Sequence, residues 1–255
     1  MKSLIIGNWK LYVNTPAEGK KLIRAIDKSL PRKLTVEIAL CPQVSLAPLL
    51  KSGFGGKRIA FGTQDVFWEA SGAHTGSVSP ESLHASGITY VILGHAEARA
   101  QGDSDETVAK KAKAAIEHKL HPIVCVGEPV SDAQGAYLSY LSNNVRMSLS
   151  RIDPKDASRF TIAYDPLWAI GLEKAPPPRT VSESVMFVRK TIADMWGRER
   201  ALKVRIIYGG SVNAESAREL KEIGGIQGLL PGRASVNAKE FTDIIRAFSK
   251  NPSPK

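Results

Sequence analysis

Short apolar runs alternate with amphipathic stretches along the whole chain, and this alternation limits the possible folds more than any other feature. Each run is rich in Ile, Val, Leu or aromatic residues and stops at or beside a turn-forming residue. Because the runs are apolar throughout, they are typical of strands buried on both faces, as in a parallel sheet. The predicted strands are Leu4–Asn8, Thr35–Cys41, Arg58–Gln64, Tyr90–Gly94, Pro122–Gly127, Thr161–Asp165, Val204–Gly209 and Ile226–Leu230.

The stretches between these strands have the apolar spacing of amphipathic helices. One of them begins well, because Ser104 precedes Asp105 and Glu106, and acidic side chains stabilise the positive end of a helix. The predicted helices are Ala17–Leu30, Val108–His118, Tyr137–Leu149, Ser182–Trp196, Ala214–Ile223 and Lys239–Phe248.

Eight strands in 255 residues give about 32 residues for each strand and helix, close to the ~30 of a βαβ element. An open, doubly wound sheet would usually have fewer strands and a glycine-rich first turn, which Gly7-Asn8-Trp9-Lys10 does not provide. The sequence therefore predicts an α/β fold, a single-domain (β/α)₈ barrel of eight parallel strands ringed by helices. We expect the barrel to span residues 1–248, followed by a frayed polar tail over 249–255.

The charge, apolar runs and cysteines of the chain indicate which kinds of partner it can have. The net charge of +10 suggests an anionic partner, which a phosphorylated metabolite, a nucleic acid or a membrane surface could supply. The basic residues lie in short groups on predicted helices, without interleaved aromatic residues, so we expect no nucleic acid. No apolar run reaches the roughly 18 residues of a membrane helix, and the apolar stretch near the N-terminus is too short for a signal peptide. We therefore expect a cytoplasmic protein with no membrane partner. Cys41 and Cys125 have neither disulfide-framework nor metal-ligand spacing, so we expect no metal.

Polar side chains cluster where the predicted strands end, which is where barrels of this kind build their active sites. An amide and an ammonium follow the first strand, an imidazole the fourth and a carboxylate the sixth. Glycine-rich turns after the seventh and eighth strands open onto helices, and such turns present backbone N–H groups that suit a phosphate. The pattern indicates proton transfer on a small phosphorylated carbonyl compound. The residues are Asn8, Lys10, His95, Glu97, Asp165, Gly209-Gly210-Ser211 and Gly232-Arg233-Ala234-Ser235.

Seven segments, in order and along nearly the whole chain, resemble the triosephosphate isomerase family. They are Gly7-Asn8-Trp9-Lys10, Gly72-Ala73-His74-Thr75-Gly76, Gly94-His95-Ala96-Glu97, Cys125-Val126-Gly127-Glu128, Ala163-Tyr164-Asp165-Pro166-Leu167-Trp168-Ala169-Ile170-Gly171, Tyr208-Gly209-Gly210-Ser211-Val212-Asn213 and Gly232-Arg233-Ala234-Ser235. The resemblance implies a TIM barrel of glycolysis and gluconeogenesis. It also implies interconversion of dihydroxyacetone phosphate and D-glyceraldehyde 3-phosphate through an enediolate, with no cofactor.

The resemblance also assigns roles. Members of this family combine a carboxylate base, a neutral histidine and a loop that closes over the site. Carried onto this chain, Asp165 stands at the base position, and Lys10 would stabilise negative charge. Asn8 would help to position the substrate oxygen, His95 would polarise the carbonyl, and Glu97 would hold Lys10. The phosphate would be received by backbone N–H groups of Gly171, Ser211, Gly232 and Arg233.

The chain departs from the family at the base. Asp165 stands where the family has glutamate, so the carboxylate reaches roughly 1.5 Å less from an unmoved backbone, the length of one C–C bond. The family serine that holds the base in the empty site is Ala96 here. These two changes are compatible with each other and suggest a reduced rate.

Further departures concern the subunit interface, the lid and the phosphate turn. The family forms homodimers in which the loop matching Gly72–Gly76 enters the partner subunit, and we expect a homodimer here. Ser77 and Ala98 replace both members of an ion pair between the subunits. In the lid, Leu172-Glu173 replaces a Thr-Gly pair and Pro176–Pro178 stiffens the second hinge, while Arg233 replaces a glycine and adds a side chain at the phosphate turn.

Two alternatives remain open at this point. The shorter base and altered lid could suit an isomerase of another small sugar phosphate. They could also belong to a catalytically impaired barrel that binds phosphorylated ligands.

Overall fold

The computed structural model describes residues 1–130, 135–169, 176–223 and 225–249. Its centre is a closed barrel in which each strand is parallel to the next in chain order. The eighth strand closes the ring, since Leu4 and Ile5 pair with Gly228 and Leu229. The strands are β1 (Ser3–Asn8), β2 (Val36–Cys41), β3 (Ala60–Thr63), β4 (Tyr90–Leu93), β5 (His121–Val126), β6 (Thr161–Tyr164), β7 (Arg205–Gly209) and β8 (Gly228–Leu230).

All eight predicted strands are confirmed, and the open-sheet alternative is excluded by the pairing of β1 with β8. Some boundaries differ by one or two residues. The largest difference is at β3, which covers Ala60–Thr63 and not the predicted Arg58–Gln64. Gln64 leaves the strand because its side-chain amide bonds to the backbone of two neighbouring segments, which fixes the turn that follows.

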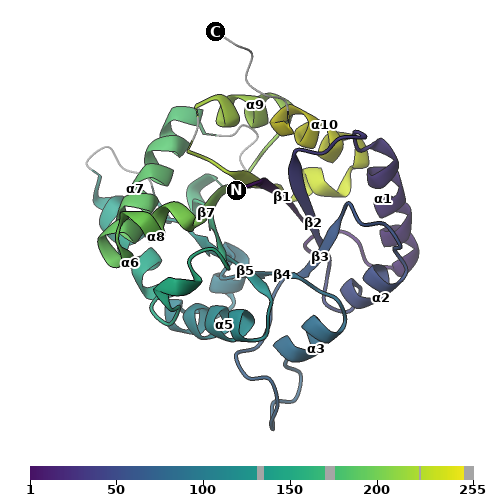
Figure 1. Cartoon of the computed structure of the whole chain (residues 1–255), viewed down its shortest axis with the longest axis horizontal. Coiled ribbons are helices and arrows are strands. Elements are labelled where there is room, and N and C mark those ends of the chain that lie inside the picture. Colours follow the sequence, from purple (N-terminus) through teal and green to yellow (C-terminus); the bar gives the residue numbers. More distant parts are fainter. Residues whose placement is uncertain (131–134, 170–175, 224, 250–255) are drawn as a thin grey trace.

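Helices form a ring around the barrel (Figure 1). They are α1 (Pro16–Ser29), α2 (Ala47–Ser52), α3 (Pro80–Ala85), α4 (Ala96–Ala100), α5 (Asp105–Glu117), α6 (Ala136–Ser148), α7 (Pro178–Trp196), α8 (Arg198–Lys203), α9 (Ala214–Ile223) and α10 (Ala238–Ser249), with 3₁₀ turns η1 (Pro154–Asp156), η2 (Leu167–Ala169) and η3 (Arg233–Val236). The six predicted helices are present. Ser249, predicted to open the tail, is the last residue of α10, and residues 250–255 lie outside the described residues.

Side-chain caps fix the starts of some helices, among them α1 and α5. At α5, the Ser104 hydroxyl accepts a hydrogen bond from the Thr107 backbone N–H, and Asp105 and Glu106 occupy the first turn. A cap of this kind satisfies one of the free N–H groups at a helix N-terminus and contributes about 1 kcal/mol. The local sequence therefore fixes where this helix begins, and with it the path of the preceding loop.

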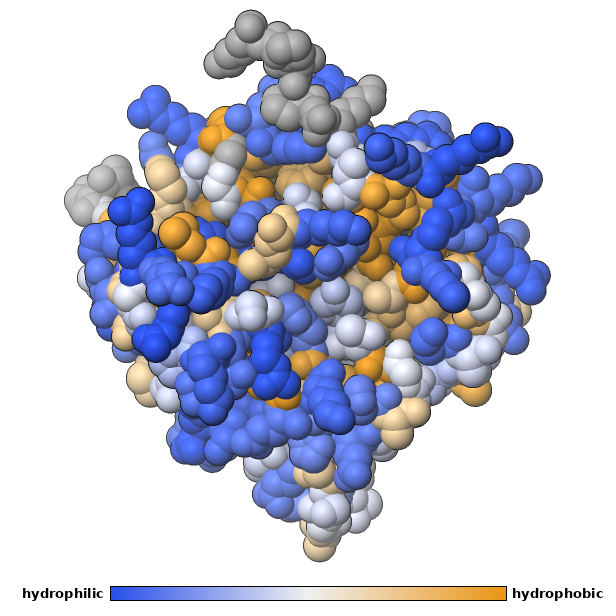
Figure 2. Space-filling view, in the orientation of Figure 1, coloured by the Kyte–Doolittle hydropathy of each residue, from blue (hydrophilic) through white to orange (hydrophobic). Residues whose placement is uncertain are grey.

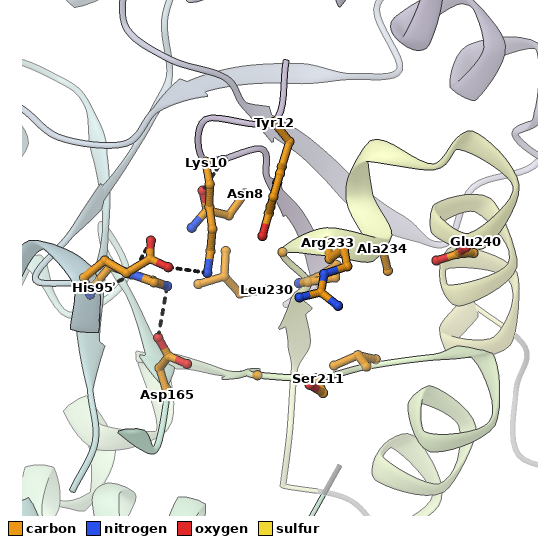
Figure 3. Close-up of a pocket in the computed structure, with 15 residues that line it drawn as sticks. Asn8, Lys10, Tyr12, His95, Asp165, Ser211, Leu230, Arg233, Ala234 and Glu240 are labelled. Atoms are coloured by element: carbon orange, nitrogen blue, oxygen red, sulfur yellow. Dashed lines mark hydrogen bonds and ion pairs between the residues drawn. The ribbon is translucent and has the colours of Figure 1, made fainter. Parts of the chain in front are cut away.

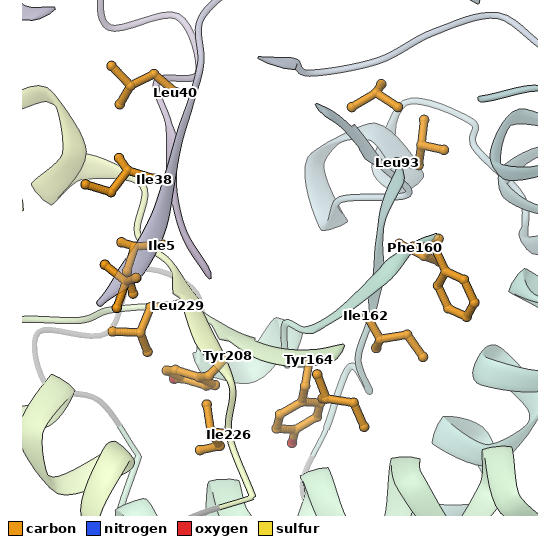
Figure 4. Packing of buried hydrophobic residues seen from close by; sticks show 14 of the residues in the cluster. Ile5, Ile38, Leu40, Leu93, Phe160, Ile162, Tyr164, Tyr208, Ile226 and Leu229 are labelled. Carbon is orange, nitrogen blue, oxygen red and sulfur yellow. The ribbon is translucent and has the colours of Figure 1, made fainter. Parts of the chain in front are cut away.

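Two apolar layers hold the barrel and its helices together. Side chains such as Ile5 and Ile38 point outward and pack beneath the helices (Figure 4). Their neighbours Leu4 and Ile6 belong to a separate buried cluster that also contains Ala39, as expected for alternate residues of β1 facing inward. Strands buried on both faces explain why the predicted runs are apolar without alternation.

The outer surface is mostly polar. Figure 2 shows hydrophilic side chains over most of the visible face, with hydrophobic residues between them. The segment that joins β3 to α3 projects beyond the ring of helices in Figure 1. Among the described residues, no helix has the length and apolar character needed to cross a membrane.

Candidate active site

A cavity of about 420 Å³ opens at the carboxyl ends of the strands (Figure 3). Eight of the nine predicted site residues line it. The lining residues are Asn8, Lys10, Tyr12, His95, Glu97, Asp165, Gly210, Ser211, Val212, Leu230, Pro231, Gly232, Arg233, Ala234 and Glu240. Residues separated by more than two hundred positions in the chain meet here because parallel strands all end on the same rim of the barrel.

Lys10 follows β1 in a strained backbone conformation. Its φ of 45° lies in the left-handed region, which is unfavourable for a residue with a side chain. The Lys10 N–H donates to Asn8 Oδ1 at 3.1 Å, and the Lys10 carbonyl accepts from Gln64 Nε2 at 2.9 Å. Its Nζ lies 2.7 Å from Glu97 Oε1. Three neighbours therefore fix both the backbone and the charge of this lysine.

The His95 imidazole is oriented by the helix that it starts. His95 caps α4, and its Nδ1 accepts a hydrogen bond from the Glu97 backbone N–H at 3.2 Å. Because Nδ1 acts as the acceptor, the proton of the neutral ring is assigned to Nε2. Nε2 faces the cavity and lies 3.4 Å from Asp165 Oδ2. The local helix start thus aims an N–H donor at the space beside the carboxylate.

The Asp165 carboxylate is nearly inaccessible to solvent, with 4% of the residue exposed. Burial raises the pKa of this carboxyl above its usual range, while the neighbouring His95 and Lys10 side chains act in the opposite direction. Within the described structure Asp165 Oδ2 accepts no hydrogen bond, and the 3.4 Å approach of His95 does not have hydrogen-bond geometry. A buried carboxylate oxygen without a donor is a stronger base than a solvated one.

Two glycines allow Asp165 to lie this deep. A Cβ atom at Gly127 would collide with the Asp165 carbonyl oxygen, and one at Gly209 would come within 3.0 Å of Asp165 Oδ1. Any side chain at either position would therefore push the carboxylate or its backbone outward. These glycines of β7 and of the turn after β5 set the depth of the base position.

A polar network lies behind the imidazole and the carboxylate. Arg99 donates from Nε to the Gly94 carbonyl and from Nη1 to Asp105 Oδ1, at 2.7 and 2.6 Å. Asn144 Nδ2 donates to the same Asp105 oxygen, and Asn144 Oδ1 accepts from the Gly127 N–H. The network connects the chain just before the imidazole to the glycine behind the carboxylate, and so stabilises their separation.

The turns after β7 and β8 form the other wall of the cavity. Gly210 has a φ of +130°, a conformation that favours glycine, and Ser211 and Gly232 line the cavity beyond it. A Cβ at Gly232 would lie 3.9 Å from Lys10 Nζ, so the lysine stands beside this turn. The arrangement brings a cation and two glycine-rich turns to one end of the cavity, which suits a small anion.

Part of the predicted lid lies outside the described residues. This applies to the predicted phosphate ligand Gly171 and to Leu172-Glu173. Just before them, Trp168 in η2 donates from Nε1 to Glu128 Oε1 at 2.8 Å, and the Tyr164 hydroxyl donates to the same oxygen at 2.7 Å. The segment just before the predicted lid is therefore attached to the carboxylate of Glu128, which is fully buried.

Several site residues were not singled out from the sequence. Tyr12 and Glu240 line the cavity, and Gln64 holds the Lys10 carbonyl without lining it. Tyr12 could have been found, since it follows Lys10 by two residues on the same loop. Gln64 gave no signal, because its role depends on the packing of β3 against β1 and β2, which the sequence does not display.

The side chains that line the cavity define a class of protein. The site contains a buried carboxylate, an imidazole N–H donor, a fixed ammonium and two turns suited to a phosphate. Among the described residues no cluster of three or more His, Cys, Asp or Glu side chains could hold a metal ion. These are the components of a barrel enzyme that moves protons on a small anionic carbonyl compound.

Comparison with known proteins agrees with this class. The family model described as triosephosphate isomerase matches residues 3–248. The triosephosphate isomerase of Carboxydothermus hydrogenoformans is 40% identical over 247 residues, covering 96% of this chain and 98% of the relative. Those of Thermoanaerobacter pseudethanolicus and Endomicrobium trichonymphae are each 38% identical, covering 96% and 98% of this chain and 98% and 99% of the relatives. The chain belongs to the triosephosphate isomerase family, a family of aldose–ketose isomerases.

Proposed function

We propose that the protein interconverts dihydroxyacetone phosphate and D-glyceraldehyde 3-phosphate, with Asp165 as the catalytic base. The observation that carries the proposal is the pairing of Asp165 Oδ2 with His95 Nε2, 3.4 Å apart at the bottom of the cavity. A base and an N–H donor at this separation can flank adjacent carbon and oxygen atoms of one substrate. The family relationship supplies the substrate class.

The reaction proceeds by proton transfer alone. Asp165 removes a proton from carbon 1 of dihydroxyacetone phosphate, and the electron pair of that C–H bond forms the double bond between carbons 1 and 2. The carbonyl electrons move onto oxygen 2, where His95 Nε2–H donates and Lys10 stabilises the charge. Return of a proton to carbon 2, with loss of the proton on oxygen 1 and gain of one on oxygen 2, gives the aldehyde.

The remaining residues bind and position the substrate. We propose that Asn8 orients the loop of Lys10 and the substrate oxygen, and that Glu97 holds the Lys10 ammonium, consistent with their 2.7 Å contact. The phosphate would bind to backbone N–H groups of Ser211, Gly232 and Arg233 at the glycine-rich turns, together with Gly171. The reaction needs no cofactor, since each step transfers only protons.

A coupled assay tests this function directly. Conversion of glyceraldehyde 3-phosphate would be followed by consumption of the product with a dehydrogenase and reduced nicotinamide cofactor. We expect turnover that 2-carbon phosphorylated acids inhibit competitively. Turnover only on longer sugar phosphates would favour an isomerase of another specificity, and binding of phosphate without any turnover would favour a ligand-binding barrel.

We further propose that two copies form a homodimer through the Gly72–Gly76 loop. A second cavity of about 460 Å³ lies beside the Lys10 loop and is lined in part by Leu11, Val44 and Trp68. Leu11 and Val44 are 70% and 39% exposed and line this cavity together, and apolar side chains gathered at one place on a surface mark an interaction site. Insertion of the projecting loop of a second copy would cover these side chains.

The assembly is tested by sedimentation at micromolar concentration. A dimer is expected even though Ser77 and Ala98 lack the ion pair of the family, because an exposed pair contributes about 0–1 kcal/mol. A fully active monomer would contradict it.

We also propose a glycolytic and gluconeogenic role, which the family's reaction supports. We propose the cytoplasm as its location, and the two buried free thiols Cys41 and Cys125 are consistent with a reducing compartment.

A further inference from the structure

Arg233 is the first residue of η3 and directly follows the glycine of the β8 turn. Its side chain is exposed and lines the cavity together with Lys10 and Ser211. In Figure 3 the guanidinium extends from η3 and is drawn between Tyr12 and Ser211, which line the same cavity. The triosephosphate isomerase pattern has a glycine here, so this side chain is a feature of the present chain.

The charges of the cavity are unevenly paired. Two cations and three carboxylates line it among the described residues, namely Lys10, Arg233, Glu97, Asp165 and Glu240. The Lys10 ammonium is 2.7 Å from Glu97, so it already has a carboxylate partner in the protein. Arg233 makes no hydrogen bond or ion pair with any described residue, although Glu240 lines the same cavity.

We propose that the Arg233 guanidinium binds the phosphate group of the substrate, in addition to the backbone N–H groups of the turn. The inference rests on the proposed function, which supplies that phosphate. A guanidinium presents parallel N–H donors that match two phosphate oxygens, and such charge-assisted pairs are stronger than neutral hydrogen bonds. Arg233 is therefore a specificity-determining residue, which favours doubly charged phosphate esters over neutral sugars and singly charged acids.

Three variants separate the effects of the charge, the donor geometry and the position of the arginine. Arg233→Met removes the charge and keeps most of the side-chain length, and Arg233→Lys keeps the charge without the planar pair of donors. Arg24→Met is the matched control, because Arg24 is an exposed arginine on α1 that has no ion pair with a described residue and lies outside the cavity. It makes the same change in net charge.

Calorimetry with inorganic phosphate and steady-state kinetics are measured on each variant. We expect Arg233→Met to weaken phosphate binding and to raise KM about 10-fold, with kcat changed less than about 3-fold, since the lost contact is made before and during the reaction. The phosphate affinity and KM of Arg233→Lys should lie between those of Arg233→Met and the parent. Both values for Arg24→Met should match those of the parent. The KM of Arg233→Met should also depend less on salt.

The outcomes separate this inference from the proposed function. Unchanged or tighter phosphate binding in Arg233→Met would overturn the inference. A loss of phosphate affinity in Arg24→Met equal to that in Arg233→Met would also overturn it. Failure of the parent to bind phosphate would also overturn it. If the parent binds phosphate through Arg233 but does not isomerise trioses, the inference stands and the proposed function fails.

Discussion

The two ends of the barrel carry polar side chains in opposite states. At the amino-terminal end, the polar groups at the starts of the strands are paired with one another. His121 Nε2 lies 2.9 Å from Thr161 Oγ1, the Tyr90 hydroxyl donates to Glu37 Oε2 at 3.3 Å, and Arg205 Nη1 is 3.1 Å from the same oxygen. Arg205 is a partial exception, since neither Nε nor Nη1 makes a hydrogen bond to a described residue and the Nη1 contact with Glu37 is an ion pair only. We call this group the barrel floor.

At the carboxyl-terminal end, which we call the barrel mouth, several polar groups are left without partners or in unfavourable conformations. Asp165 Oδ2 accepts no hydrogen bond and Arg233 has no ion pair in the described structure, while Lys10 is held at positive φ. The unpartnered buried oxygen of Asp165 and the strained backbone of Lys10 each cost stability, whereas the Arg233 side chain is exposed to solvent. The comparison teaches that the same barrel uses polar groups to stabilise its floor and keeps those of its mouth available for a ligand.

The largest effect is expected from Asp165→Asn at the mouth. The change keeps the shape of the side chain and removes the base, so kcat should fall about 1,000-fold, within the range attributed to general bases. The free energy of unfolding should not decrease, because a buried carboxylate without a donor is removed. Coupled kinetics and urea unfolding check both statements. Glu240→Gln, which changes a carboxylate lining the same cavity, is the control and should retain the parental rate.

Asp165→Glu is expected to have the next largest effect, and in the opposite direction. The added methylene carries the oxygen roughly 1.5 Å farther toward the substrate, and a misplacement of about 1 Å can cost on the order of 100-fold. We expect kcat to rise by about 10- to 1,000-fold, measured by the same assay. An unchanged or lower rate would mean that the cavity, with Gly209 packed against the carboxylate, is shaped around aspartate.

A smaller effect is predicted at the floor, as a dependence of stability on pH. Burial lowers the pKa of His121 from 6.5 to about 3. Below about pH 6.5 the unfolded chain therefore binds a proton at His121, whereas His121 of the folded chain stays unprotonated. The free energy of unfolding should fall as pH decreases, by about 1.4 kcal/mol per pH unit.

Urea unfolding between pH 6.5 and 4.5 measures this dependence. Over that interval the parent should lose about 2 kcal/mol more than His121→Gln, and both proteins should have similar kcat at pH 7.5. Parallel pH profiles would show that His121 does not carry the effect. A large loss of kcat in His121→Gln would break the division between floor and mouth.

The smallest predicted effect is a gain in stability at the mouth. Lys10→Gly relieves the left-handed strain, which costs about 1–2 kcal/mol, but gives the unfolded chain more freedom. We expect the free energy of unfolding to rise by about 0.5–1 kcal/mol while turnover is lost. Lower stability in this variant would mean that the contacts of the Lys10 side chain outweigh the strain.

The sequence alone predicts those features of the fold and site that depend on local order along the chain. Asn8, His95 and Asp165 were found because each comes at or just after the end of an apolar run, and parallel strands bring such positions to one rim. The capping serine of α5 was readable for the same reason, since its partner lies three residues away.

Contacts between distant segments could not be predicted in this way. The floor pairs His121 with Thr161, forty positions later, and Glu37 with Arg205, and both pairs depend on which strands become neighbours when the ring closes. The depth of Asp165 depends on Gly127 and Gly209, whose role is visible only once the backbones approach. Pairing and depth are properties of packing, and sequence spacing does not encode them.

The central claim is that Asp165 transfers the carbon-bound proton, and isotope exchange tests it most directly. Dihydroxyacetone phosphate would be incubated with the parent and with Asp165→Asn in D₂O, and proton NMR would follow deuterium entering carbon 1 of the substrate and carbon 2 of the product. We predict exchange at both carbons with the parent, and exchange at least about 100-fold slower with Asp165→Asn. Exchange and isomerisation by Asp165→Asn at the parental rates would contradict the claim.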